Sequence, residues 1–231
     1  MNGSWRIFRA LGIDVHVHWS WFIALMILFQ LFGGDNPAMF LLLFGTLFGV
    51  VLMHEYGHAL ACRSVGGRVG HIVLWPLGGM AYVQPPARPS ALLWTIAAGP
   101  LVNLVLIPVG IGALLVGGAL GVSDAIVMYL NWFVYINVLL FLFNMLPAYP
   151  LDGGQILQGI LWYFMPRTRA IIYSSAIGLV FGAVMVAFGL LGSINPDVGR
   201  TIPINPFWMV ILGGFIAWEA WKTHQMAKRR M

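Results

Sequence analysis

Three polar side chains with the spacing His-Glu-x-x-His lie inside an otherwise apolar run, Val50–Ser64. They are His54, Glu55 and His58, and Glu55 is one of only two glutamates in the chain. Residues four positions apart lie on one face of a helix, so both imidazoles can reach a single ion. Neutral imidazole is a preferred ligand of zinc, and a glutamate beside the metal can take a proton from a water molecule. The spacing therefore predicts a hydrolytic zinc site in which His54 and His58 bind the metal and Glu55 is the catalytic base.

Such a site needs a third protein ligand, because catalytic zinc usually has three and keeps one open position. The metzincin pattern requires glycine and histidine where this chain has Ala61 and Ser64, so that class is excluded. The other glutamate, Glu219, is predicted to lie at the cytoplasmic interface beside the basic C-terminal segment. Cys62 would lie about 12 Å along the helix axis from the first histidine, so we expect a buried thiol there rather than a ligand.

Asp152 is the remaining candidate, within Phe143–Leu157, "FNMLPAYPLDGGQIL". Pro147 and Pro150 are expected to end the preceding helix. An aspartate before Gly-Gly can cap a turn or, where a broken helix end aims its carboxylate inward, bind a metal. Both His58 and Asp152 are predicted near the ends of helices that run in the same direction across a membrane, which favours the ligand.

The composition is typical of an integral membrane protein. Of 231 residues, 60% are hydrophobic and 8% are charged, whereas a soluble domain has about 25% charged residues. About 20 apolar residues are needed to cross the hydrocarbon core. The fold class we expect is an all-α polytopic membrane protein with about six transmembrane helices, forming one domain over residues 1–231. The predicted spans are approximately Trp19–Phe32, Met39–Ala61, Ala91–Gly117, Ala125–Leu146, Ala170–Leu191 and Phe207–Trp221.

The basic residues indicate an orientation. Eleven of the twelve Lys and Arg residues fall on one side of the predicted spans, and only Arg200 falls on the other. The positive-inside rule then places both termini in the cytoplasm of a multi-pass protein of the cell membrane. Because the basic residues follow the membrane topology, we expect no nucleic-acid partner.

The segment Arg68–Pro89 between the second and third spans is too apolar for an ordinary loop and too interrupted by glycine and proline for a span. Val69–Trp75 and Met80–Val83 are predicted as two short strands, a membrane-associated hairpin-like segment. The alternation of "GIDVHVHWS" near the N-terminus indicates a further strand. The sequence does not define the roles of the remaining histidines near these strands, which are His16, His18 and His71.

The motifs, taken together, resemble the site-2 protease family of intramembrane zinc metalloproteases, peptidase family M50. The resemblance rests on "HEYGH" in one span and "NMLPAYPLDGG" at the end of a later one, with "AAGPLVNL" (Ala97–Leu104) and "VHWS" in addition. It implies one zinc ion bound by His54, His58 and Asp152, with Glu55 as base. It also implies roles for Asn144 and Asn103 near the substrate or the oxyanion. We expect neither of the PDZ and CBS domains that many members carry.

The expected function is zinc-dependent hydrolysis of a peptide bond in or near a transmembrane segment of a membrane-protein substrate. Two alternatives remain open at this stage. One is an inactive family member that acts as a membrane binding or chaperone module, although the intact Glu55 argues against it. The other is an ion-coupled transporter, which would require matching broken helices in both halves of the chain. The sequence identifies neither the substrate nor the oligomeric state.

Overall fold

A computed structural model describes residues 3–32, 34, 36–76, 78–201 and 205–229 of the chain. The chain divides into two compact units, Met1–Leu142 and Phe143–Met231, each with its own hydrophobic cluster. Large apolar side chains are widely exposed on the helices; Leu115, for example, is 72% exposed. A surface of this kind is expected where lipid, and not water, surrounds the protein.

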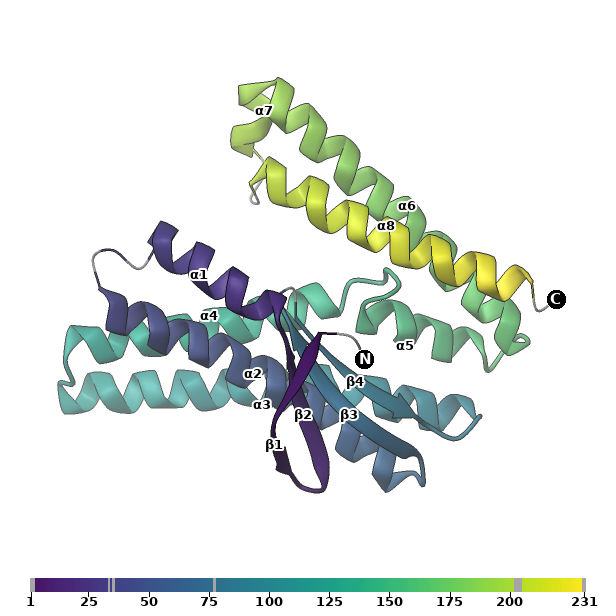
Figure 1. Ribbon diagram of the computed structural model, residues 1–231, viewed down its shortest axis with the longest axis horizontal. Helices are drawn as coiled ribbons and strands as arrows, with labels where there is room; N and C mark the ends of the chain where they lie inside the picture. The colour runs from purple at the N-terminus through teal and green to yellow at the C-terminus, as the bar shows by residue number, and fades with distance from the viewer. Residues whose placement is uncertain (1–2, 33, 35, 77, 202–204, 230–231) are drawn as a thin grey trace. The chain divides into compact units, whose positions relative to one another are not determined.

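A small mixed sheet with strand order β1-β2-β3-β4 belongs to the first unit (Figure 1). Its strands are β1 (Ser4–Ala10), β2 (Ile13–His18), β3 (Arg68–Trp75) and β4 (Gly78–Gln84). β1 and β2 are antiparallel, as are β3 and β4, whereas β2 and β3 pair in parallel. β4 is therefore an edge strand of this sheet.

The alternation of β2 determines which face of the sheet is covered. Ile13, Val15 and Val17 are buried, and the residues between them are only partly buried. The buried side chains form a cluster with Phe44 and Phe48 of the second helix. One face of the sheet therefore packs on the helices, and the other carries polar side chains, as expected from the two-residue period of a strand.

Four helices complete the first unit: α1 (Ser20–Phe32), α2 (Pro37–Ser64), α3 (Pro89–Leu120) and α4 (Asp124–Asn144). α2 begins where Asn36 Oδ1 accepts a hydrogen bond from the Met39 N–H, which is a standard N-cap. α3 ends at Gly121, which has the left-handed conformation that favours glycine. α2 and α3 approach closely at Gly57, where a Cβ would lie 2.6 Å from the Ala98 carbonyl oxygen. This close approach brings α3 beside the His-Glu-x-x-His face of α2.

The second unit is helical: α5 (Asp152–Leu161), α6 (Arg167–Ile194), α7 (Pro196–Thr201) and α8 (Pro206–Lys228). α6 and α8 lie side by side (Figure 1). Their contact uses small residues, since a Cβ at Gly182 would lie 2.7 Å from the Gly213 carbonyl oxygen. Small residues that let backbones approach are typical of helix pairs in membranes.

The fold agrees with the sequence prediction in part. Within the described residues, α2, α3, α4 and α6 are long and apolar enough to span a membrane. α1 has only 13 residues, and α8 carries Glu219 and Lys222, so the structure supports four of the six predicted spans by length and composition.

The strand predictions were right about β2, β3 and β4, but the protein is not all-α. The predicted hairpin is half of a four-stranded sheet, and β1 was not predicted. Leu77, in the predicted turn of the hairpin, lies outside the described residues.

Candidate metal centre

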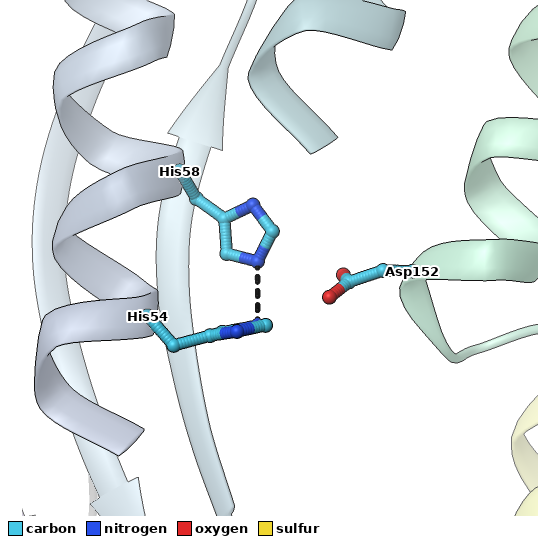
Figure 2. Close-up of side chains that lie close together, drawn as sticks. All are labelled: His54, His58 and Asp152. Carbon is cyan, nitrogen blue, oxygen red and sulfur yellow. Dashed lines mark hydrogen bonds between the residues drawn. The ribbon is translucent and has the colours of Figure 1, made fainter. Parts of the chain in front are cut away.

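The two histidines of the His-Glu-x-x-His motif face each other on α2. His54 Nε2 and His58 Nε2 are 3.1 Å apart, and Figure 2 shows this contact as a dashed line between the two rings. Both side chains are buried, with 5% and 6% of their surface exposed. The predicted helical face is therefore confirmed, because a four-residue separation has placed both rings on one side of α2.

The outer nitrogen of each imidazole has a partner on α3. His58 Nδ1 lies 2.9 Å from the Thr95 carbonyl oxygen, and His54 Nδ1 lies 2.7 Å from Asn103 Oδ1. Both partners are oxygens that can only accept, so both imidazoles carry a proton on Nδ1 when they are neutral. The lone pair of each neutral ring is then on Nε2, the nitrogen that faces the other histidine.

The two Nε2 lone pairs face each other, and this arrangement favours the binding of a cation between or beside them. Two Nε2 atoms 3.1 Å apart, each with a lone pair, repel one another unless a proton or a metal ion is shared. A Cβ at position 99 would collide with His58 Nε2 and lie 2.8 Å from His54 Nε2, so Gly99 leaves open the space beside both nitrogens. The donor set and the space therefore fit a metal ion that accepts imidazole nitrogen, as zinc does.

Glu55 is buried and is held by the backbone of the edge strand. The Ala81 N–H of β4 donates a 2.7 Å hydrogen bond to Glu55 Oε2. A Cβ at Gly79 would lie 2.5 Å from Glu55 Cγ, so only glycine fits there with the glutamate in this position. The sheet thus fixes the direction of the carboxylate next to the two histidines on the same helix.

Asp152 is the first residue of α5 and is buried, with 7% of its surface exposed. Two of the three predicted ligands, His54 and His58, belong to the first unit, and Asp152 belongs to the second. Two imidazoles and a carboxylate are a set of ligands that catalytic zinc uses in other enzymes.

The other residues considered from the sequence lie in different surroundings. Asn144 is the last residue of α4 and is partly buried. Cys62 is a buried free thiol, as predicted. Glu219 pairs with Lys222 at 2.6 Å on α8, within the basic segment near which it was predicted. Asn103 is fully buried, and both ends of its amide are used, the oxygen by His54 and the nitrogen by Asn137.

Asn137 is a residue of this region that sequence reasoning missed. It is fully buried on α4, and its Oδ1 accepts a 3.1 Å hydrogen bond from Asn103 Nδ2. A polar residue inside a span is a functional candidate by default. That rule was the available signal, but Asn137 belongs to no motif and its partner is 34 positions away.

The histidines near the N-terminus lie on the sheet. His18 Nδ1 is 2.6 Å from the Ser20 hydroxyl, and the rings of His16 and His71 have centroids 5.2 Å apart. Burial lowers the pKa of His71, and the charge of His16 lowers it further, whereas Asp14 acts in the opposite direction. His71 is therefore neutral near pH 7.

Comparison with known proteins adds an independent line of support. The sequence model of peptidase family M50 matches residues 41–120 and 108–187. The chain is 32% identical to a putative zinc metalloprotease of Synechocystis sp., over 99% of this chain and 62% of that protein. It is 31% identical to a zinc metalloprotease of Methanocaldococcus jannaschii, over 83% of this chain and 55% of that protein.

A solved structure is also similar. The site-2 protease from Methanocaldococcus jannaschii superposes with a TM-score of 0.67 and 26% sequence identity, over 96% of this chain and 95% of that chain. The chain spans between one half and two thirds of the length of the curated relatives named above.

Proposed function

This chain belongs to peptidase family M50, as its motifs predicted, and from that premise we propose that it is a zinc-dependent intramembrane endopeptidase. It hydrolyses a peptide bond in or near a transmembrane segment of a membrane-protein substrate. The observation that carries the proposal is the arrangement on α2, where Glu55 lies beside two histidines whose Nε2 lone pairs face each other. Four helices are long and apolar enough to span a membrane, which indicates a multi-pass membrane protein.

We assign His54, His58 and Asp152 as the zinc ligands. Their residue types and their burial support this assignment. Two neutral imidazoles and one carboxylate leave the site with a net positive charge when the divalent ion is bound. A zinc ion held by these three side chains would be able to take up water or substrate as well, as in other catalytic zinc sites.

Glu55 is the general base of the proposed mechanism. When bound, zinc supplies Lewis acidity and makes a water molecule easier to deprotonate. Glu55 takes a proton from water and gives it to the leaving amine. The Ala81 N–H donates to Oε2 and so keeps the carboxylate in place beside the two histidines.

The two asparagines receive different roles. Asn144 is proposed to donate a hydrogen bond to the developing oxyanion, an effect of about 3–4 kcal/mol where a single donor has been removed in other enzymes. Both ends of the Asn103 amide are already hydrogen-bonded within the protein. We therefore propose that Asn103 orients His54 and does not contact the substrate.

The substrate must be extended at the scissile bond, because the backbone groups of a helix are already hydrogen-bonded to one another. β4 is an edge strand, and it also holds the catalytic base. An extended segment that added to this edge would lie next to Glu55. We therefore propose that β4 presents the substrate, with its backbone pairing along the strand.

The membrane arrangement follows from the basic residues. We propose that both termini are cytoplasmic and that residues 1–231 act as one transmembrane protease domain. In this arrangement α1 and α8 would enter the bilayer together with the four longer helices, giving the six predicted crossings.

The decisive experiment replaces Glu55 by glutamine. The amide oxygen can still accept from the Ala81 N–H, whereas the basic carboxylate is lost. Cleavage of a transmembrane peptide by the purified, zinc-loaded protein should fall by about 10²–10⁴-fold, and the zinc content should not change.

The other glutamate of the chain provides the matched control. Glu219→Gln on α8 should cleave like the wild type, because that carboxylate pairs with Lys222. Equal cleavage by Glu55→Gln and wild type would exclude Glu55 as the base. A wild-type protein that binds zinc but cleaves no transmembrane peptide would favour the inactive, binding alternative.

A further inference from the structure

Three hydrogen bonds in series connect His54 to the backbone of α4. His54 Nδ1 lies 2.7 Å from Asn103 Oδ1, and Asn103 Nδ2 lies 3.1 Å from Asn137 Oδ1. Asn137 Nδ2 then lies 2.8 Å from the Phe133 carbonyl oxygen. Both asparagines are fully buried in helices that are apolar enough to cross a membrane. Polar groups at that depth are costly, so their presence calls for a physical reason.

The direction of this series is fixed at its α4 end. A backbone carbonyl oxygen can only accept, so the part of Asn137 that faces Phe133 is its NH2 group. The oxygen of Asn137 then faces Asn103 and accepts from the NH2 group of that residue. The oxygen of Asn103 is left to face His54, where it accepts from Nδ1–H. Each amide orientation therefore follows from the one before it.

We propose that Asn137 is a positioning residue of the metal centre: through Asn103 it selects the His54 tautomer whose lone pair is on Nε2. This inference rests on the proposed zinc site and concerns how one ligand is prepared for the metal. With the Asn103 amide reversed, an NH2 group would face Nδ1, and the imidazole proton would move to Nε2. That nitrogen could then bind a metal only after losing its proton.

His58 needs no comparable series. The Thr95 carbonyl oxygen is a backbone group and cannot reverse, so it holds the proton of His58 on Nδ1 directly. The two histidines of one motif are thus prepared in different ways. A side-chain amide such as Asn103 has two possible orientations and requires a second residue to choose between them.

The test uses Asn137→Leu, since leucine has the same number of side-chain heavy atoms, suits an apolar helix and makes no hydrogen bond. Asn131→Leu is the matched control. Asn131 lies on the same helix, is exposed, and donates to the Val127 carbonyl at 2.9 Å with the same four-residue spacing. Zinc affinity is measured by competition with a chromophoric chelator on the full-length protein in detergent. Asn137→Leu should weaken zinc binding by about tenfold, as outer partners of metal ligands do, and Asn131→Leu should not.

A second variant separates positioning from packing. In Asn103→Asp both side-chain oxygens accept, so His54 Nδ1–H is bound without help from Asn137. In the Asn103→Asp protein, adding Asn137→Leu should therefore cause no further loss of zinc affinity. An equal loss in both backgrounds would show that Asn137 contributes only packing, and would overturn the inference.

The tautomer itself is observable. Nitrogen-15 spectra of histidine-labelled, zinc-free protein should show His54 with its proton on Nδ1 in the wild type and in Asn131→Leu. In Asn137→Leu a population with the proton on Nε2 should appear. An unchanged His54 signal in Asn137→Leu would overturn the inference even if zinc affinity fell. Failure of the wild type to bind zinc would contradict the proposed function, whereas the tautomer spectra would still decide the role of Asn137.

Discussion

The proposed metal centre has a histidine half in the first unit and an aspartate half in the second unit, and the two are held in place by different means. In the first unit each functional side chain has a hydrogen bond of its own: His54 to Asn103, His58 to the Thr95 carbonyl, and Glu55 to the Ala81 N–H. In the second unit, close backbone packing surrounds the start of α5. A Cβ at Gly154 would lie 2.5 Å from the Ala148 carbonyl carbon and 2.7 Å from Tyr149 Cα.

This difference follows from the chemistry of the two ligand types. An imidazole has two unlike nitrogens, and a metal site needs the proton on a particular one of them. A carboxylate has two equivalent oxygens when it is ionised, so it has only to be placed. Hydrogen bonds select protonation states, whereas close packing fixes positions. The histidine half therefore depends on polar partners, and close backbone packing at glycines contributes to the placement of the aspartate half.

The largest effect is expected from Asp152→Ala. Zinc affinity should fall by more than the roughly 100-fold that loss of an outer partner can cost, because a proposed ligand itself is removed. Elemental analysis of the purified protein measures the loss. Asp124→Ala is the matched control, since Asp124 is also the first residue of a helix but is exposed. Full zinc retention by Asp152→Ala would remove this residue from the ligand set.

A smaller effect is expected from Gly154→Ala, which leaves every ligand in place. The added methyl group would collide with the backbone around Tyr149, and such overpacking costs about 1–3 kcal/mol of stability. Thermal unfolding in detergent should show a lower midpoint, together with a lower zinc content. Gly214→Ala on α8 adds the same methyl group where no atom lies within 4 Å. Equal behaviour of the two variants would mean that packing does not hold the start of α5.

The smallest effect is expected from Thr95→Val, which sharpens the comparison within the histidine half. The acceptor for His58 is the backbone carbonyl, and valine keeps both that carbonyl and the branched shape of the side chain. Zinc affinity, measured by chelator competition, should be unchanged. A loss comparable to that expected for Asn137→Leu would show that the threonine hydroxyl, and not the carbonyl, orients His58.

Much of this centre was predictable from the sequence because its motifs are local. The two histidines and Glu55 are linked by helical spacing, and Asp152 was indicated by elimination and by the proline-broken helix before it. Asn137 could not be predicted. Its role depends on three helices meeting, and one isolated asparagine in an apolar helix has no spacing that reveals its partner.

The same contrast between local and distant information applies to the fold. The limits of the long helices were predicted to within a few residues, because an apolar run and its proline or asparagine boundaries are local signals. The parallel pairing of β2 with β3 joins segments more than 50 positions apart, with Val15 opposite Ile72. β1 was missed because its side chains, such as Trp5 and Ile7, are mostly exposed and show no alternation of burial.

The hydrogen bond from the Ala81 N–H to Glu55 has a consequence for how this protein tolerates change. Every amino acid except proline supplies a backbone N–H, so the hydrogen bond itself does not depend on the side chain at position 81. Proline at this position would release the base, whereas other substitutions would act through packing, because Ala81 lies against the hydrophobic cluster of the first unit. Evolution can therefore vary the exposed side chains of this strand, such as Met80 and Tyr82, to suit new substrates while the hydrogen bond to the base is kept.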